Sequence, residues 1–184
     1  TANSFGARWF DEAWRPQFDP AEWTRTLDFY VGLMRDAGPP GAAANGFNET
    51  LALFRAGKCG LWIDATVAGS FVSDASDSMV AGKVGFAPAP HAGLGKRADW
   101  LWAWALAIPA GSKKTAAAQK FIAWATSKDY LALVAARDGW AHVPPGTRAS
   151  LYGDPGYRAA APFAAVTLAS INSADPTRPT VKPV

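Results

Sequence analysis

The sequence predicts an α/β fold, and three observations carry that prediction. Helical patterns alternate along the chain with short apolar runs of strand length, an order typical of α/β domains. Hydrophobic residues make up 49% of the 184 residues and charged residues 18%, which is a globular composition. The chain is also long enough to bury a sizeable core, either as one large domain or as two small ones.

The clearest α/β unit spans residues 48–66. It begins with a helical pattern whose apolar residues are three apart, and Gly57 follows at the position where helices often end. An apolar strand at 59–63 comes next and stops at a polar corner formed by Asp64, Ala65 and Thr66. Because open α/β sheets present ligand-contacting groups at the carboxyl ends of their strands, we expect this corner to carry a binding site.

A longer helix precedes this unit. Asp19, Pro20 and Glu22 supply an N-cap, a proline at the first helical position and an acid in the first turn. Apolar residues then recur on one helical face as far as residue 34. The Gly-Pro-Pro-Gly stretch at 38–41 is expected to stop the helix.

Two further apolar strands are expected in the middle of the chain. Residues 83–87 form a short one, whose Pro-Ala-Pro exit is extended chain suited to crossing between domains. Residues 100–108 form the other, and strand alternation places Trp100, Trp102 and Trp104 on one face. We expect the first two indoles to line a cleft and Trp104 to lie in the core.

The remaining patterns are mostly helical. The expected elements are a short helix at 65–72, a helix capped by Ser112 or Thr115 that contains Phe121, a helix from Ser127 to Gly139, rigid extended chain at 143–146 as a second crossing, a helical turn at 147–152 and a helix from Asp154 to about Ile171.

Several function classes find little support. The formal net charge is +3 with lysines and arginines scattered, so no basic stripe suggests a nucleic-acid partner. No apolar run approaches a membrane span, and the single Cys59 excludes an internal disulfide. His91 and His142 lack metal-ligand partners at helical spacing, and no P-loop, dinucleotide or nucleophile-elbow motif is present. Binding is therefore favoured over catalysis, and no cofactor or metal is expected.

Five stretches of the sequence together resemble the extracellular solute-binding proteins of ABC importers, family 1, and within it the sorbitol/mannitol-binding branch. These stretches are NSFGARWF at 3–10, FRAGKCGLWIDAT at 54–66, VGFAPAP at 84–90, WALAIP at 104–109 and AAQKFIAW at 117–124. The resemblance covers essentially the whole chain. It implies a two-lobed, hinged periplasmic protein of the type II binding-protein fold, which closes on one small ligand and delivers it to a membrane permease.

The resemblance also implies a division of the chain between the two lobes. Residues 1–86 would belong to the second lobe, residues 87–144 would return to the first, and residues 145–184 would go back to the second. The N-terminal half of the first lobe and the C-terminal helices of the family would be missing, so we expect a fragment of a longer protein. That longer protein is expected to be a monomer.

The resemblance implies that five residues of this chain contribute to a binding site for a sugar alcohol. The polar corner supplies Asp64 and Thr66, whose oxygens would bond ligand hydroxyls, and Trp102 would stack on the carbon chain. Phe47 and Asn48 could face the ligand or could cap and staple the next helix. Asp64 could likewise act as a helix N-cap.

Two other functions stay open as alternatives. A carbohydrate-active hydrolase could use the same aromatic groove, since the chain carries nine tryptophans, but it needs a pair of carboxylates that the sequence does not supply. The other alternative is a structural lobe fragment whose tryptophans all lie in the core.

Overall fold

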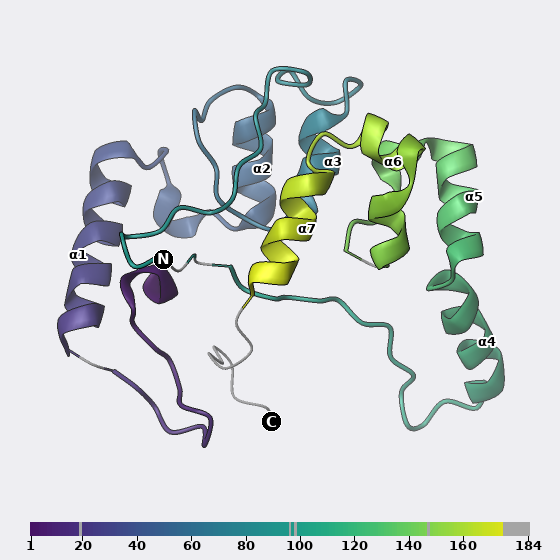
Figure 1. The fold of residues 1–184 in the computed structure, drawn as a ribbon, viewed down its shortest axis with the longest axis horizontal. Coiled ribbons are helices and arrows are strands. Elements are labelled where there is room, and N and C mark those ends of the chain that lie inside the picture. The colour runs from purple at the N-terminus through teal and green to yellow at the C-terminus, as the bar shows by residue number, and fades with distance from the viewer. Residues whose placement is uncertain (19, 96, 98, 147, 175–184) are drawn as a thin grey trace.

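The computed structural model describes residues 1–18, 20–95, 97, 99–146 and 148–174. Within these residues the chain is a succession of helices joined by extended segments (Figure 1). The α-helices are α1 (Pro20–Ala37), α2 (Phe47–Arg55), α3 (Ala68–Ser73), α4 (Thr115–Ala125), α5 (Lys128–Asp138), α6 (Pro155–Ala160) and α7 (Ala164–Ser173), and the 3-10 helices are η1 (Ala2–Phe5), η2 (Ala42–Ala44), η3 (Trp140–His142) and η4 (Ala149–Gly153).

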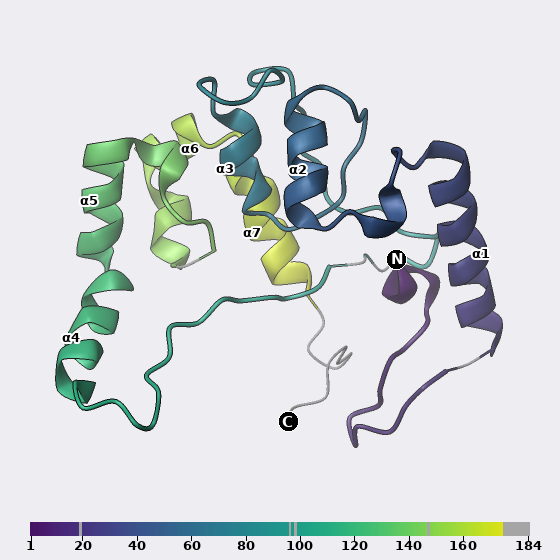
Figure 2. The same ribbon diagram turned by 180° about the vertical axis from the view of Figure 1, so that it is seen from behind.

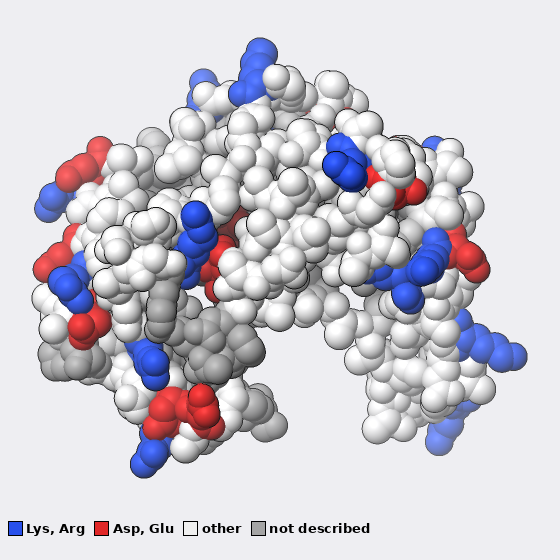
Figure 3. Space-filling model, in the orientation of Figure 1, with Lys and Arg blue, Asp and Glu red and all other residues white. Residues whose placement is uncertain are grey.

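The molecule has the shape of an arch. Helix α1 stands at one end and the α4–α5 pair at the other, as the view from behind also shows (Figure 2). A long extended segment runs from the middle of the arch to the foot of α4 (Figure 1). The space-filling view shows a deep notch between the two legs (Figure 3). None of the helices in the described part of the chain is long and apolar enough to cross a membrane.

Helix α1 forms as predicted and packs on the N-terminal segment. It ends at Ala37, directly before the predicted stop, while the predicted cap Asp19 lies outside the described residues. The Trp23 indole N–H donates to the carbonyls of Gln17 at 3.0 Å and Arg8 at 3.1 Å. Its ring meets Trp9 edge-on at 4.7 Å. These contacts attach the irregular N-terminal chain to the helix.

Helices α2 and α3 run side by side in the same direction. Gly57 takes a left-handed φ of 70° just beyond the end of α2, a conformation that glycine adopts without a Cβ clash. The Arg55 side chain, at the C-terminal end of α2, donates through Nε to the Asp77 carbonyl at 2.8 Å, and the Met79 amide donates to the Arg55 carbonyl at 3.0 Å. Since both contacts join the end of α2 to chain just beyond α3, the two helices begin at the opposite, common end.

The main buried cluster lies in the C-terminal part of the chain. Tyr157 and Val143 are 0% exposed and Phe163 is 2% exposed. The Phe163 ring packs edge-on against Phe86 at 5.7 Å and lies so close to Gly69 that a Cβ there would approach the ring carbons to 2.5 Å. Phe163 therefore joins α3 to the beginning of α7.

One predicted helix is wrong in length. The helix expected from Asp154 to Ile171 divides into α6 and α7 around Pro162. Proline disfavours helical conformation at the residue before it, and Ala161 accordingly has φ −115° and ψ 86°. The predicted caps Asp154 and Ser127 are confirmed, because both side chains accept backbone N–H groups. The predicted side-chain cap of α4 is wrong, since Lys114 holds that position without a side-chain cap bond.

The expected strands are not paired with one another or with any other described residue. In the part of the chain that the structure describes, the bridge between Phe10 and Pro16 is the only β-type pairing. Residues 100–108 are extended (Figure 1), whereas 59–63 and 83–87 are irregular chain with bends at Gly60 and Lys83, and none of the three runs forms a ladder with another described residue. A helix satisfies its backbone groups internally, whereas a strand needs a neighbour. Trp104, expected in the core, is 91% exposed.

Candidate ligand-binding site

The polar corner leads directly into α3. The Asp64 carboxylate accepts the Ala65 amide through Oδ1 at 2.7 Å, and the Gly69 amide donates to the Thr66 carbonyl at 3.1 Å. Val67, not Asp64, is the N-cap residue of α3, so the alternative role of Asp64 as the cap is wrong. Asp64 and Thr66 are both exposed, and no described residue bonds Asp64 Oδ2. That oxygen is available to a ligand hydroxyl.

Phe47 and Asn48 begin α2 beside this corner. The Phe47 ring lies 5.5 Å from the ring of Trp62, which stands two residues before Asp64 and also packs on Phe54 at 5.7 Å. Asn48 is exposed in the first turn of α2. The shared aromatic contact and the parallel course of α2 and α3 bring these four candidate residues to one end of the helix pair. Trp62 completes the cluster, although sequence reasoning did not select it.

Trp102 belongs to a different part of the structure. Its ring lies 5.0 Å from Trp100 and 6.2 Å from Trp104, both edge-on, so the three indoles form a ladder along the extended segment. Trp102 is 57% exposed. The segment is held to the C-terminal end of α7 by a hydrogen bond from the Ser173 hydroxyl to the Asp99 carboxylate. Among the described residues, the ring contacts of Trp102 are with Trp100 and Trp104, and none is with the Asp64 corner.

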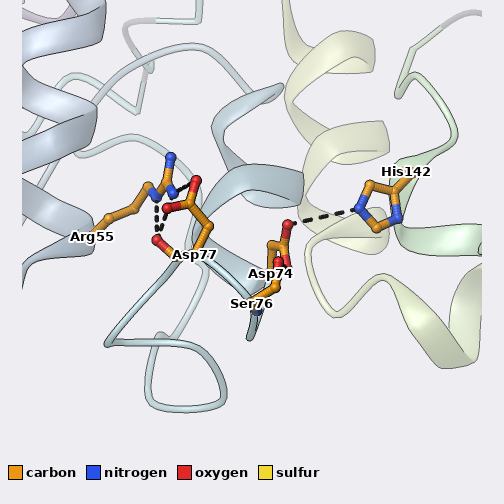
Figure 4. Close-up of polar contacts among 5 residues, drawn as sticks. All are labelled: Arg55, Asp74, Ser76, Asp77 and His142. Carbon is orange, nitrogen blue, oxygen red and sulfur yellow. Dashed lines mark hydrogen bonds and ion pairs between the residues drawn. The ribbon is translucent and has the colours of Figure 1, made fainter. Parts of the chain in front are cut away.

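A polar network lies at the opposite end of α2 and α3 (Figure 4). Asp77 pairs with the Arg55 guanidinium, and Asp74 accepts both the Ser76 hydroxyl at 2.6 Å and the Ser76 amide at 2.8 Å. These bonds from Ser76, with smaller contributions from the nearby charges of His142 and Arg55, hold the pKa of Asp74 below its usual value. His142 Nε2 lies 3.9 Å from Asp74 Oδ2, which connects the end of α3 to η3. The network therefore connects the C-terminal end of α2 to the chain just beyond α3, and the end of α3 to η3.

An open pocket of about 400 Å³ lies beside η1 and α1. Its polar residues include Arg25, whose Nη2 is 3.2 Å from Glu22 Oε1, and the exposed Arg8. The pocket could not be predicted from the sequence, because Leu94 joins the lining from far along the chain and the other residues, between positions 5 and 25, come together only in the fold. The full lining is Phe5, Gly6, Arg8, Gln17, Glu22, Arg25 and Leu94. No group of three or more potential metal ligands occurs in the described ranges.

The comparisons with known proteins agree on one family. The family model for bacterial extracellular solute-binding proteins matches residues 1–132. The chain is 60% identical over 183 residues to a mannitol-binding protein of Pseudomonas aeruginosa, covering 100% of this chain and 42% of that protein. A probable amino-acid ABC transporter periplasmic-binding protein of Sinorhizobium fredii is 29% identical over 126 residues, covering 68% of this chain and 28% of that protein.

A solved structure of a solute-binding protein also matches this chain. The crystal structure of an ABC transporter solute-binding protein from Agrobacterium vitis S4, with bound D-mannitol, is 71% identical and matches with a TM-score of 0.90. The match covers 100% of this chain and 44% of that one. This chain thus spans less than half the length of these two relatives.

These matches confirm the predicted family, the predicted fold and the preference for binding over catalysis. The α/β, type II binding-protein fold is that of the solved relative, of which this chain corresponds to a part. The relatives are solute-binding proteins, which agrees with binding over catalysis and removes support from the hydrolase alternative. The structural alternative placed all tryptophans in the core, and that part of it is wrong for this chain, because Trp100, Trp102 and Trp104 are each more than half exposed. The chain belongs to the family of bacterial extracellular solute-binding proteins.

Proposed function

We propose that the longer protein to which this chain corresponds binds a sugar alcohol, D-mannitol first, and delivers it to an ABC importer. One observation carries the proposal. Over its whole length the chain is 71% identical to a structure whose printed description includes bound D-mannitol. The mannitol-binding protein of Pseudomonas aeruginosa, 60% identical, supports the same ligand.

The chemistry of the corner suits a polyol. An ionised carboxylate accepts hydroxyl hydrogen bonds, and such charge-assisted bonds are stronger than neutral ones. Asp64 already uses Oδ1 for the Ala65 amide, which fixes the orientation of the carboxylate and leaves Oδ2 for ligand hydroxyls. Thr66 and Asn48 add a hydroxyl and an amide at the same end of the helix pair. We propose that these three side chains bind the hydroxyl groups of the polyol.

Aromatic rings would bind the carbon chain. Phe47 is held by Trp62, which is itself held by Phe54, so its ring has a fixed position next to the corner. Trp102 offers an exposed indole face from the extended segment. Aromatic faces bury C–H groups and exclude water from the hydrogen bonds beside them. We assign both rings to the proposed site.

The proposal includes the architecture and the partners of the longer protein. Residues 1–86 and 145–184 would lie in one lobe and residues 87–144 in the other, with the ligand between them. The protein would act in the periplasm as a monomer, and its macromolecular partner would be the membrane permease. The ligand would be released chemically unchanged, and no cofactor would take part.

The test uses a chimaera in which this chain replaces the 183 residues that it matches in the Pseudomonas aeruginosa protein. Calorimetric titration with D-mannitol should give micromolar or tighter binding. Asp64→Asn should weaken it about 10-fold or more, because a charge-assisted bond contributes roughly 1.5–3 kcal/mol. Asp28→Asn, an exposed carboxylate on α1, is the matched control and should bind as the unsubstituted chimaera does.

Each alternative outcome has a meaning. Binding that survives Asp64→Asn would keep the function and remove Asp64 from the site. A folded chimaera that releases no heat with D-mannitol or D-sorbitol would overturn the proposal.

A further inference from the structure

The pocket beside η1 and α1 is separate from the candidate polyol site. None of the residues that line it is among the candidates Phe47, Asn48, Asp64, Thr66 and Trp102. Its volume of about 400 Å³ lies within the range of small-molecule sites. The lining combines charged side chains and an amide with two apolar side chains. A mixed lining of this kind is typical of sites for small polar ligands.

One indole holds two parts of this lining together. The Trp23 N–H donates to the carbonyls of both Arg8, at 3.1 Å, and Gln17, at 3.0 Å. The Gln17 side-chain nitrogen in turn donates to the Asp11 carboxylate at 3.3 Å, which orients the amide. Because the nitrogen is used in this way, the amide oxygen, to which no described residue donates, is left as an acceptor. The pocket is therefore arranged before any ligand binds.

Phe5 and Leu94 form the apolar part of the lining. The Phe5 ring packs against Phe29 of α1, with 5.2 Å between the ring centroids. Leu94 is 54% exposed and lies so close to Gly6 that a Cβ there would be 3.3 Å from the Leu94 Cδ1. Gly6 also has a left-handed φ of 90°, which glycine adopts without strain. Glycine at this position therefore keeps space free between η1 and Leu94.

The charges of the lining leave one guanidinium without a partner. Arg25 and Glu22 form an ion pair, with 3.2 Å between Nη2 and Oε1. The Arg8 side chain is exposed and makes no hydrogen bond or ion pair with a described residue. Two guanidiniums and one carboxylate give the lining a net charge of +1. A ligand with a single negative charge neutralises this lining, whereas a dianion such as a phosphate monoester places excess negative charge beside Glu22.

We propose that this pocket binds a small hydroxy carboxylate, in which one carboxylate stands on a short carbon chain with neighbouring hydroxyl groups. The planar Arg8 guanidinium pairs with both carboxylate oxygens, a geometry that these two groups share. Gln17 Oε1 and Glu22 Oε2 accept the hydroxyl hydrogens. Phe5 and Leu94 cover the C–H groups of the carbon chain. This second site does not depend on the proposed polyol function, because it uses none of the same residues.

Calorimetric titration of D-gluconate into the 184-residue chain tests the proposal, because all of the lining lies within this chain. A Kd of about 1 mM or tighter is expected. Arg8→Gln should weaken binding about 10-fold or more, because it removes a charge-assisted pair. Arg8→Lys keeps the charge but loses the planar fork, so it should weaken binding by a smaller factor. Arg35→Gln is the matched control, since Arg35 is exposed in the last turn of α1 and outside the lining, and its affinity should be unchanged.

Nuclear magnetic resonance spectra locate the bound ligand. D-Gluconate should shift the signals of the Arg8 Nε–H and of the Gly6 amide, since both residues line the pocket. The same shifts should appear in the Asp64→Asn variant and in the presence of D-mannitol. They should also appear in the chimaera saturated with D-mannitol. These arms separate the hydroxy-carboxylate site from the polyol site, so each proposal can fail without the other.

Four results would refute the proposal. The absence of heat and of shifts with D-gluconate would leave the pocket without this ligand, and an equal affinity for inorganic phosphate would make it a general anion site. Loss of D-gluconate binding in Asp64→Asn, or competition with D-mannitol, would place D-gluconate in the polyol site. Unchanged affinity in Arg8→Gln would remove Arg8 from the site. If circular dichroism shows that Arg8→Gln does not fold, Arg8→Lys takes its place, and unchanged affinity there has the same meaning.

Discussion

The buried cluster between α5 and α7 and the segment at residues 100–108 are both rich in large apolar side chains, yet only the first is packed. Tyr157 and Phe163 are at most 2% exposed, whereas Trp102 and Trp104 are 57% and 91% exposed. Hydrophobic composition is therefore not what separates the two regions. The difference lies in where the partners are along the chain.

The cluster is built from elements close in sequence. The elements η3, η4, α6 and α7 follow one another within about 35 residues, and each helix satisfies its own backbone before it packs. A strand cannot do this, since its amides and carbonyls need a neighbouring strand. A chain that holds part of a sheet protein can thus complete its helical clusters and still leave its strands open.

The largest expected effect comes from deleting one ring in each region of the 184-residue chain. Phe163→Ala should lower the free energy of unfolding by about 3–5 kcal/mol, because it opens a cavity in the cluster. Trp104→Ala should change it by no more than about 0.5 kcal/mol, because the ring is 91% exposed. Urea unfolding followed by far-UV circular dichroism checks both. Equal changes in the free energy of unfolding would contradict the claim that only the cluster is packed.

A methyl group added beside Phe163 should have the next largest effect. In Gly69→Ala the new Cβ would lie 2.5 Å from a carbon of the Phe163 ring, so the ring or α3 must shift. A cost of roughly 1–3 kcal/mol is expected in urea unfolding. Gly60→Ala, with no heavy atom within 4 Å of its Cβ, is the matched control and should not destabilise the chain. A neutral Gly69→Ala would mean that α3 is not held against the cluster.

Removing a helix cap should cost less. The Asp154 carboxylate accepts the amides of Gly156 at 2.8 Å and Tyr157 at 3.2 Å, which begins α6 within the cluster. Asp154→Ala should cost about 1 kcal/mol in the same unfolding measurement. Asp129→Ala, an exposed acid on α5, gives the baseline for losing a carboxylate that does not cap a helix. Equal losses would contradict a capping role.

The smallest effect is confined to alkaline pH. Burial and, to a smaller extent, the neighbouring Tyr152 together raise the pKa of Tyr157 to about 12. The unfolded chain would ionise this phenol near its usual value of 10.0. Folded chains then hold more protons than unfolded ones between about pH 10 and 12, so the stability present below pH 10 falls through this range.

The Tyr157→Phe variant isolates that contribution. It should remove part of the alkaline slope in the urea midpoint, whereas Tyr30→Phe, with its exposed ring, should not. At pH 7 the variant should be neutral or stabilising, since no described residue bonds the buried Tyr157 hydroxyl. A marked loss of stability at pH 7 would reveal a hydrogen bond at that hydroxyl.

The helices were largely predictable from sequence because their signals are local. The Gly-Pro-Pro-Gly stop of α1, Ser127 at the start of α5 and Asp154 at the start of α6 each act within a few residues. The predicted undivided helix from Asp154 to Ile171 is wrong because Pro162 interrupts it, and that signal is equally local.

The strands and the site were less predictable because they depend on distant chain. The apolar run at 100–108 is extended, as expected, and neither it nor the run at 59–63 is helical, but their pairing needs neighbours that the described residues do not supply. At the site, sequence alone could place Phe47 near Asp64 only through the family resemblance. The structure adds the physical link, Trp62, whose contact with Phe47 could not be read from spacing. The site residues and the lobe boundaries remain predictions.

One measurement tests the central claim that this chain carries part of a polyol site completed by further polypeptide. D-mannitol is titrated calorimetrically into the isolated 184-residue chain and into the chimaera under the same conditions. The account predicts clear binding by the chimaera and an affinity at least about 100-fold weaker, or no measurable heat, for the isolated chain. Equal affinity of the two would contradict it, because the site would then be complete within these 184 residues.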